Sequence, residues 1–258
     1  MRIRLCSDLH IVVRNYILKD KTGLFFPNLN DIDVLVVAGD ICEGALGVNW
    51  LNSLKTDIPI IYVFGNHEYY SHNFPRTLHD AKRIANPNVH VLENDTVVIG
   101  NTSFHGATLW TDFDAFNEQQ ESMKLLRHRM NDFSLIYSDY GTLHPSDVLK
   151  EHYRSLDYLK LALQQSTSTN KVVVTHHAPS LQSCAPIYRH DRLSAGFASN
   201  LEEMIEQYKP TAWFHGHMHN RSKYKIGDTI VECNPYGYRK ERDGLAAGFE
   251  YDHVLELP

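Results

Sequence analysis

The chain has 258 residues, of which 43% are hydrophobic, and its formal net charge at pH 7 is -6. This length fits one large α/β domain or two small ones, and the hydrophobic content is sufficient for a core without disulfides or a structural metal. The acidic balance and the lack of a long basic run exclude a nucleic-acid tail and a membrane-surface patch, so we expect nucleic acid only as short fragments or nucleotides.

The cysteines and the apolar stretches argue for a reducing compartment and against a membrane partner. The four cysteines, Cys6, Cys42, Cys184 and Cys233, show no Cys-x-x-Cys pairing and no zinc-finger spacing. The N-terminus does not resemble a signal peptide, and no apolar stretch approaches the ~20 residues that span a bilayer. We therefore expect a cytoplasmic protein, and the sequence leaves its oligomeric state open.

Apolar periodicity predicts alternating strands and helices over the first two-thirds of the chain, which is the pattern of an α/β layered domain. The expected strands, in chain order, cover residues 2–7, 34–38, 58–64, 95–99, 102–109, 172–175, 211–215, 222–226 and 229–233. The expected helices cover 48–54, a segment capped by Asn73 with Pro75 in its first turn, 146–165, and a segment opened by a Ser199–Glu202 capping box. Residues 111–145 are expected to be a helical insertion over the sheet edge. No repeat or linker divides the chain, so we expect one domain over 1–258.

Five of the expected strands end in residue types that bind metals. In chain order these residues are Asp8 and His10, Asp40, Asn66 and His67, His176 and His177, and His217 and His219. Ligands of open α/β sheets bind outside the carboxyl ends of the strands. The pattern therefore predicts one polar pocket built from five distant segments, with a metal centre as its occupant.

The same segments resemble the five motifs of the calcineurin-like metallophosphoesterases. They are Asp8-x-His10, Gly39-Asp40, Gly65-Asn66-His67-Glu68, His176 and Gly216-His217-x-His219, in the family's order. Each motif is short, but all five in order at strand ends would rarely arise by chance, and they extend over most of the chain. The resemblance implies an α/β fold, an αββα sandwich of two mixed sheets flanked by helices, and metal-dependent hydrolysis of phosphoesters.

The resemblance also implies a ligand set for two metal ions. Asp8, His10 and His219 would hold the first metal, Asn66, His176 and His217 the second, and Asp40 would bridge both. Oxygen ligands mixed with imidazoles suit manganese, iron or zinc, whereas an all-oxygen set would suit calcium or magnesium. Two cations about 3.5–4 Å apart lower the pKa of a bridging water and clamp the oxygens of an in-line displacement at phosphorus.

Adjacent residues in two motifs, His67 and Glu68 in one and His176 and His177 in the other, are expected to have different roles. In the family, the residue equivalent to His67 assists the leaving group, so we expect His67 and the bridging Asp40 to be catalytic. Glu68 is expected to support the ligands or to be purely structural. His176 is favoured over His177 as the ligand, because it directly follows the apolar run and stands three residues before Pro179.

Three loops are candidate walls of the substrate pocket: 110–114, 178–198 and 234–243. A solvated loop is the alternative for each. The candidate substrate contacts, in these loops and near the motifs, are His72, Trp110, Asp112, His177, Arg189 and Tyr236.

The segment after Gly39-Asp40 bears on the choice of substrate. Protein Ser/Thr phosphatases of this superfamily carry an arginine there, whereas this chain has Ile41, Cys42 and the acidic Glu43. Since a bidentate guanidinium matters more for a doubly charged monoester than for a diester, we expect phosphodiesters or promiscuous small organic phosphates as substrates. The alternatives are a phosphomonoesterase or protein phosphatase and a nuclease. A non-catalytic scaffold is less favoured, because every ligand position and His67 are retained.

Overall fold

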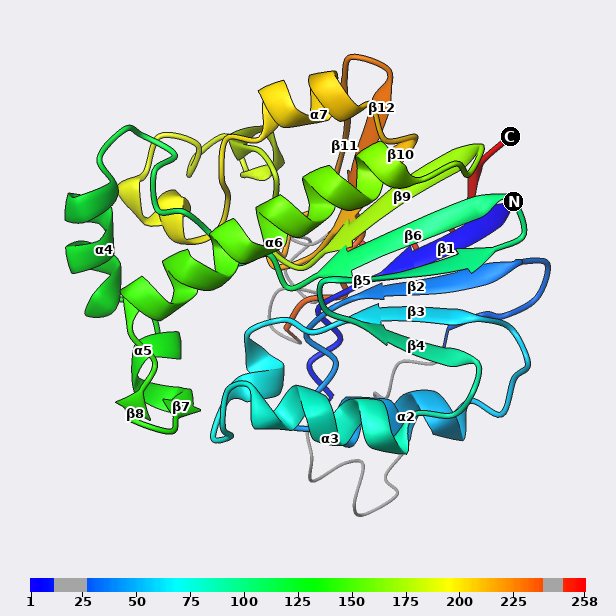
Figure 1. Cartoon of the computed structure of the whole chain (residues 1–258), viewed down its shortest axis with the longest axis horizontal. Helices are drawn as coiled ribbons and strands as arrows, with labels where there is room; N and C mark the ends of the chain where they lie inside the picture. The colour runs from blue at the N-terminus through cyan, green and yellow to red at the C-terminus, as the bar shows by residue number, and fades with distance from the viewer. Residues whose placement is uncertain (12–26, 239–247) are drawn as a thin grey trace.

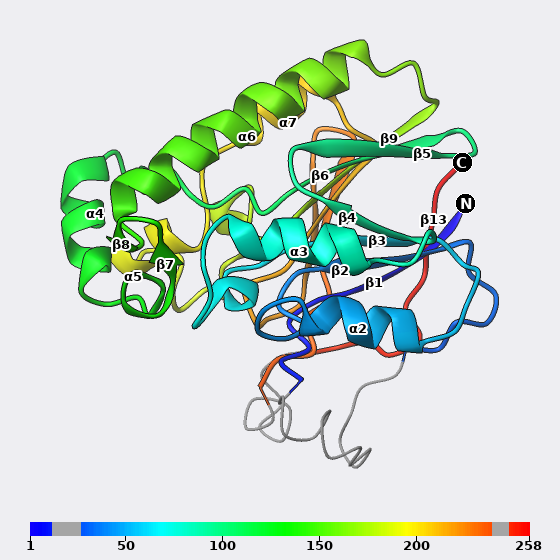
Figure 2. The same ribbon diagram turned by 60° about the horizontal axis from the view of Figure 1, so that its bottom comes forward.

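The structure, a computed structural model, describes residues 1–11, 27–238 and 248–258. Two β-sheets lie face to face in the middle of the molecule, and helices cover the outer face of each sheet (Figures 1 and 2). Both sheets contain parallel and antiparallel neighbours. The predicted αββα sandwich of two mixed sheets is therefore confirmed.

The first sheet has the strand order β13-β1-β2-β3-β4. Its strands are β1 (Arg2–Cys6), β2 (Val34–Ala38), β3 (Ile60–Val63), β4 (Val89–Leu92) and the antiparallel edge strand β13 (Leu255–Glu256). Helices α2 (Leu46–Ser53) and α3 (Arg76–Ile84) lie together against its outer face, as Figure 2 shows.

The second sheet has the order β11-β12-β10-β9-β6-β5, with antiparallel strands at both edges. Its strands are β5 (Asp95–Ile99), β6 (Thr102–Ala107), β9 (Asn170–Thr175), β10 (Ala212–His215), β11 (Ser222–Ile226) and β12 (Thr229–Cys233). Helices α6 (Pro145–Gln165) and α7 (Glu202–Tyr208) pack on its outer face. All nine strands expected from the sequence are present, and most of their ends agree within a residue or two.

The remaining elements gather at the end of the molecule opposite the two termini (Figure 1). They are α4 (Gln119–Arg127), α5 (Asp132–Leu135), the small hairpin β7 (Tyr137–Ser138) and β8 (Gly141–Thr142), and the 3-10 turns η1 (His67–Tyr69), η2 (Leu181–Ser183) and η3 (Arg192–Gly196). Of the helices described, none combines the length and the apolar composition needed to cross a membrane.

The central strands read as continuous apolar runs because both of their faces are buried. In β2, Val34 and Val36 pack in the core between the two sheets, whereas Leu35 and Val37 face outward. The outward pair belongs to the same core as Val48 of α2. The helices therefore bury the outer face, and the strand ends remain as the place where polar side chains can collect.

Two predicted helix starts are wrong, because tertiary partners take the side chains that were expected to cap. Asn73 makes no side-chain cap, and its Nδ2 instead donates to Asp139 at 3.1 Å. The Ser199–Glu202 capping box does not form: the side chain of Glu202 accepts the hydroxyl of Ser180 at 2.5 Å. Asn73 and Glu202 thus bond to residues that are distant in the chain, and local spacing does not reveal such partners.

Candidate metal centre

The seven predicted ligands meet at the carboxyl ends of β1, β2, β3, β9 and β10. Six of them form two groups of potential ligand atoms, each group within 4.8 Å: Asp8, His10, Asp40 and His219 in one, and Asp40, His176 and His217 in the other. Asp40 belongs to both groups. The geometry thus brings together strand ends from both sheets, with one carboxylate between two clusters.

In the first group, two imidazole nitrogens face each other. His10 Nε2 lies 2.9 Å from His219 Nε2, and His219 Nε2 lies 3.4 Å from Asp8 Oδ1. Asp40 Oδ2 is 3.9 Å from His10 Nε2. Facing lone pairs of this kind repel one another unless a proton or a cation lies between them.

In the second group, His176 is the candidate ligand that lies close to the other three. Its Nε2 lies 3.1 Å from His217 Nδ1, 3.2 Å from Asn66 Oδ1 and 3.4 Å from Asp40 Oδ1. Its other nitrogen, Nδ1, lies 2.9 Å from the carbonyl oxygen of Ala38, which can only accept. Nδ1 must therefore carry the proton, and the lone pair of Nε2 is directed at the cluster, as in many metal-bound histidines.

His177 lies outside both groups. It is buried, its Nδ1 faces the carbonyl of Thr108 at 3.3 Å, and its ring centroid is 5.2 Å from that of Trp110. Burial holds the pKa of His177 well below its usual value. The structure thus places His176, and not His177, among the candidate ligands.

The electrostatics of the cluster favour positive charge. Asp8 and Asp40 are fully buried, yet their ion-pair partners among the described residues are histidines only. Although burial opposes ionisation, His176 and His67 hold the pKa of Asp40 well below its usual value. Burial would lower the pKa of His176, but the charges of Asp40 and Asp8 raise it to about 10. The buried charges of Asp8 and Asp40 thus favour a cation at the point where the candidate ligand atoms converge.

Two buried atoms of the cluster have no hydrogen-bond partner among the described residues: Asp40 Oδ2 and His217 Nε2. An unpaired buried polar atom costs about 1–3 kcal/mol. Together with the facing imidazoles and the mixed oxygen and nitrogen donors, these unpaired atoms fit a site for borderline cations such as manganese, iron or zinc.

The backbone at the ligands is held in an unusual conformation. Five candidate ligands have positive φ angles: Asp8 (53°), His10 (44°), Asp40 (57°), His217 (68°) and His219 (49°). Non-glycine residues rarely adopt this left-handed region, and such strain collects at functional sites. Backbone hydrogen bonds from Asp8 to Gly39 and from His10 to Asp40, both 3.0 Å, hold two of these turns in register.

Gly65 leaves room for the ligands to approach each other. A Cβ atom at this position would lie 2.1 Å from Asp40 Oδ1 and 2.6 Å from His176 Cε1. Neither neighbour can move without leaving the cluster. The glycine of the Gly-Asn-His-Glu motif is thus required by packing around Asp40.

Glu68 joins the loops that carry Asp40 and Asn66. Its Oε2 accepts the backbone N–H groups of Gly65 (2.7 Å) and Asp40 (3.1 Å), and its Oε1 accepts those of Ile41 (2.7 Å) and the hydroxyl of Tyr62 (2.7 Å). Burial and the charge of Asp40 raise the pKa of Glu68 to about 7. Between the two roles expected for it, the contacts indicate support of the ligand loops.

His67 lies beside the ligands without joining either group. Its ring stacks on Tyr70 with centroids 4.2 Å apart, and its Nε2 lies 3.2 Å from the hydroxyl of Tyr238 and 3.9 Å from Asp40 Oδ2. Its side chain is 23% exposed, so the imidazole can meet a substrate.

Tyr238 is a site residue that the sequence did not single out, although its loop was a candidate. Its ring lies 4.3 Å from that of His10 and 4.6 Å from that of His219. Tyr236, the candidate substrate contact in this loop, packs instead against Phe249 in the core. Residues 239–243 of the same candidate loop lie outside the described residues.

Asp132 is a second residue that the sequence did not single out. It is buried at the start of α5, in the predicted insertion. Its Oδ1 accepts hydrogen bonds from Asn66 Nδ2 (2.8 Å) and from the hydroxyl of Tyr70 (2.7 Å). No motif marks it, because only the folded insertion brings α5 to the end of β3.

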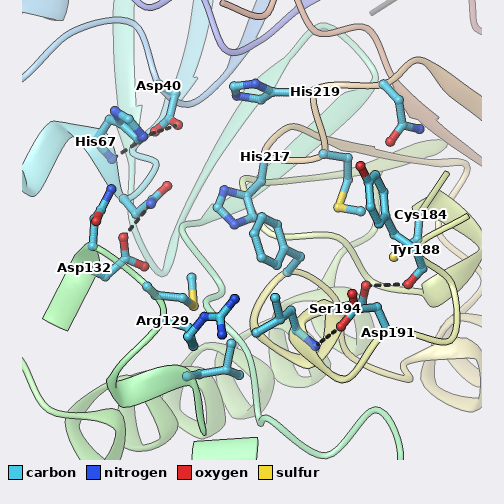
Figure 3. Close-up of a pocket in the computed structure, with 18 of the residues that line it drawn as sticks. Asp40, His67, Arg129, Asp132, Cys184, Tyr188, Asp191, Ser194, His217 and His219 are labelled. Carbon is cyan, nitrogen blue, oxygen red and sulfur yellow. Dashed lines mark hydrogen bonds and ion pairs between the residues drawn. The ribbon is translucent and has the colours of Figure 1, made fainter. Parts of the chain in front are cut away.

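A cavity of about 490 Å³ opens beside the cluster. Figure 3 shows Asp40, His67, His217 and His219 along one side, with Arg129, Tyr188 and Ser194 facing them from the other. The far side comes from the predicted insertion and from the loop 178–198, which are two of the chain's least regular segments.

None of the six candidate substrate residues is among those that line this cavity. Trp110 is 2% exposed and stacks against Tyr69 in the core. Asp112 accepts the backbone N–H of Asp114 through its carboxylate, and Arg189 donates to carbonyl groups of its own loop.

The remaining three candidates also have partners elsewhere. His72 Nδ1 faces the carbonyl oxygen of Tyr70 at 2.7 Å and its Nε2 lies near Gly44, while His177 and Tyr236 pack as described above. The position of a residue in one of the candidate loops thus did not predict whether its side chain lines the cavity.

Comparison with known proteins identifies the family of this chain. Residues 1–221 match the family model described as calcineurin-like phosphoesterase. A relative, the uncharacterized protein L509 of Acanthamoeba polyphaga mimivirus, is 30% identical over 277 residues, and the match covers 95% of this chain and 94% of that protein.

Solved structures show the same fold. The phosphopantetheinyl hydrolase PptH from Mycobacterium tuberculosis superposes with a TM-score of 0.68 at 16% identity, covering 93% of this chain and 91% of that chain. The purple acid phosphatase PPD1 from yellow lupin gives a TM-score of 0.51 at 12% identity, covering 99% of this chain and 46% of that chain. At these identities, the similarity concerns the fold alone.

Proposed function

The chain belongs to the calcineurin-like phosphoesterase family, and we propose that it is a phosphoester hydrolase that uses two metal ions. The observation that carries this proposal is the pair of ligand groups that share Asp40. Asp8, His10 and His219 would hold one metal, and Asn66, His176 and His217 the other, with Asp40 between them. When bound, two such cations supply an activated water and neutralise charge on the phosphoryl oxygens.

The chain's own contribution to the reaction is to position groups around the phosphorus. His67 Nε2 would carry the proton that the leaving oxygen takes, since it is exposed beside the ligands and belongs to neither group. Stacking on Tyr70 fixes the plane of its ring, and the hydroxyl of Tyr238 at 3.2 Å fixes its rotation about the Cβ–Cγ bond.

The charge distribution of the cavity supports phosphodiesters and small organic phosphates over protein phosphomonoesters. Among the described residues that line it, Arg129 is the only lysine or arginine, and it comes from the far wall. No guanidinium from the Gly39-Asp40 segment is available to grip a doubly charged phosphate, because Ile41 and Glu43 follow. A diester carries one charge less and needs less compensation.

The test combines metal content with turnover. The protein would be loaded with manganese, iron or zinc, its metal content measured by elemental analysis, and its hydrolysis of bis(p-nitrophenyl) phosphate compared with that of p-nitrophenyl phosphate. We expect two metals per chain, faster turnover of the diester, and loss of both metals and turnover in Asp40→Asn. Asp157→Asn, which changes an exposed carboxylate of α6, serves as the matched control.

Each result bears on a separate part of the proposal. A single metal per chain would contradict the dinuclear centre. A strong preference for the monoester would replace the diester assignment with a phosphomonoesterase. Bound metals without any turnover would favour a non-catalytic scaffold.

A further inference from the structure

The cavity beside the metal cluster is lined by more than the candidate ligands. Its lining includes five apolar side chains: Leu126, Met130, Leu193, Phe197 and Met218. A bare phosphate would occupy only a small part of about 490 Å³. The volume and the apolar lining fit the organic part of a phosphoester.

The apolar wall is packed against its neighbours. α4 approaches η3 so closely that a Cβ atom at Gly196 would lie 2.6 Å from Met130 Sδ and 3.0 Å from Leu126 Cδ2. Just after the loop 178–198, the Asn200 side chain donates to the carbonyl of Ala115, before α4, at 3.0 Å. The insertion and the loop 178–198 thus form one continuous wall of the cavity.

An aromatic ring connects this wall to the metal cluster. Phe197 stacks on the imidazole of His217, with centroids 4.7 Å apart and planes 29° apart. Because His217 is a candidate ligand, a group attached to phosphorus at the cluster would pass along Phe197 to reach Leu193 and Met130.

Arg129 brings a positive charge to this wall. Figure 3 shows its guanidinium extending into the cavity. Among the described residues it has no ion-pair or hydrogen-bond partner, and the two acids that line the cavity besides Asp40 already accept hydrogen bonds. Asp132 accepts from Asn66 and Tyr70, and Asp191 accepts the backbone N–H of Leu193 at 2.9 Å.

We propose that the substrate is a phosphoester whose organic part carries an apolar or aromatic group, bound along Phe197, Met130 and Leu193, and an anionic group beyond it, bound by Arg129. This inference rests on the proposed function, because it takes the phosphorus to lie at the metal cluster. Arg129 would pair with a carboxylate or a second phosphate of the substrate, for which a guanidinium is well suited.

Non-hydrolysable phosphonates test the pocket separately from catalysis. The affinities of methylphosphonate, benzylphosphonate and 4-carboxybenzylphosphonate for the manganese-loaded protein would be measured by calorimetry. We expect benzylphosphonate to bind at least tenfold more tightly than methylphosphonate, a difference of about 1.4 kcal/mol. The carboxylate should add a further threefold or more.

Two variants, each with a matched control, assign the effects to residues. Arg129→Gln should remove the gain from the carboxylate, and Leu193→Asn should reduce the gain from the benzyl group. Arg154→Gln and Leu161→Asn change an exposed arginine and an exposed leucine of α6, and we expect them to bind all three phosphonates like the unmodified protein.

The outcomes separate this inference from the proposed function. Two results would overturn the inference even if bis(p-nitrophenyl) phosphate is hydrolysed. One is equal affinity for the three phosphonates. The other is that Arg129→Gln still binds 4-carboxybenzylphosphonate more tightly than benzylphosphonate. Failure to hydrolyse any phosphoester would instead overturn the proposed function, whatever the phosphonates do.

Discussion

The carboxylate of Asp132 accepts a hydrogen bond from the side-chain amide of Asn66 at 2.8 Å. The amide of Asn66 is thereby oriented, with its Nδ2 toward Asp132 and its Oδ1 toward His176 at 3.2 Å. The same oxygen of Asp132 accepts the hydroxyl of Tyr70, on which His67 stacks. One residue of the predicted insertion thus positions both a candidate ligand and the candidate proton donor.

Replacing Asp132 by alanine should weaken the metal site that contains Asn66. Without its partner, the amide of Asn66 is free to turn, and removal of such supporting groups typically costs 10–100-fold in metal affinity. Calorimetric titration with manganese measures this. Asp139→Ala, which removes an exposed carboxylate from the β7–β8 turn, should leave both affinities intact. Equal metal affinities in Asp132→Ala and the control would show that Asn66 needs no support.

Replacing Glu68 by glutamine should lower the free energy of unfolding. At pH 8 the carboxylate accepts four hydrogen bonds, and an amide NH2 would face two of those donors instead. The expected loss is about 2–4 kcal/mol, measured by urea unfolding. Tyr62→Phe removes only one donor and should cost about 1 kcal/mol. A loss in Glu68→Gln no larger than that in Tyr62→Phe would argue against its role in joining the ligand loops.

Replacing His67 by alanine should slow hydrolysis according to the leaving group. A poor leaving group such as an alkoxide needs a proton, whereas p-nitrophenolate does not. The kcat for methyl p-nitrophenyl phosphate should therefore be compared with the kcat for a dialkyl phosphate diester. We expect a loss of about 10²–10⁴ for the alkyl leaving group and a much smaller loss for p-nitrophenolate. His128→Ala, an exposed histidine after α4, is the control. An equal loss for both leaving groups would contradict proton donation by His67.

Removal of metal should lower the thermal stability of the protein. Without cations, Asp40 Oδ2 and His217 Nε2 remain buried without a hydrogen-bond partner. A metal at a hundred times its dissociation constant adds about 2.7 kcal/mol, which corresponds to a rise in Tm of about 5–10 °C for a chain of this size. Thermal unfolding with manganese and with a chelator measures the shift. Asp40→Asn should show little of it, and an equal shift in that variant would place the stabilising metal elsewhere.

Glu93 should make the protein less stable as the pH rises from 5 to 8. Burial raises the pKa of this carboxyl to about 7 from a usual value of 4.5. The folded state therefore binds this proton more tightly than the unfolded chain does. The resulting contribution to the free energy of unfolding is complete below pH 4.5 and is lost as the pH rises through 7. The loss can reach about 3 kcal/mol.

Glu93→Gln isolates this effect. In the unmodified protein, the backbone N–H and the hydroxyl of Thr108 donate to Glu93 Oε2 at 2.9 Å and 2.6 Å. The amide oxygen of the glutamine can still accept both hydrogen bonds. Urea unfolding at pH 5 and pH 8 should give a smaller drop in this variant than in the unmodified protein. The exposed Glu203→Gln is the control. Identical drops in all three proteins would show that Glu93 ionises as it does in the unfolded chain.

The strands and the candidate ligands could be read from the sequence because both leave local signals. A strand buried on two faces, such as Val34–Ala38, appears as an unbroken apolar run, and its end is marked by Gly39-Asp40. The hairpin Asp95–Ile99 and Thr102–Ala107 was also predictable from its turn at Gly100 and Asn101. These features depend on residues that are close together in the chain.

Asp132, Tyr238 and Arg129 could not be predicted in the same way. Asp132 contacts Asn66 across 66 residues of sequence, and Tyr238 contacts His67 across 171. Neither spacing nor composition shows which way such side chains point. The helix cap expected at Ser199 failed for a related reason, since its hydroxyl accepts the backbone N–H of Asp112, far away in the chain.

The distribution of the ligands along the chain has a consequence for biosynthesis. Each of the two ligand groups needs a histidine from the turn after β10, His219 in one and His217 in the other, although their first members lie near residues 8 and 40. A ribosome-bound chain therefore exposes Asp8, His10 and Asp40 long before either group is complete. In the proposed centre, neither metal ion therefore gains its full set of ligands until the chain has been synthesised through His217 and His219.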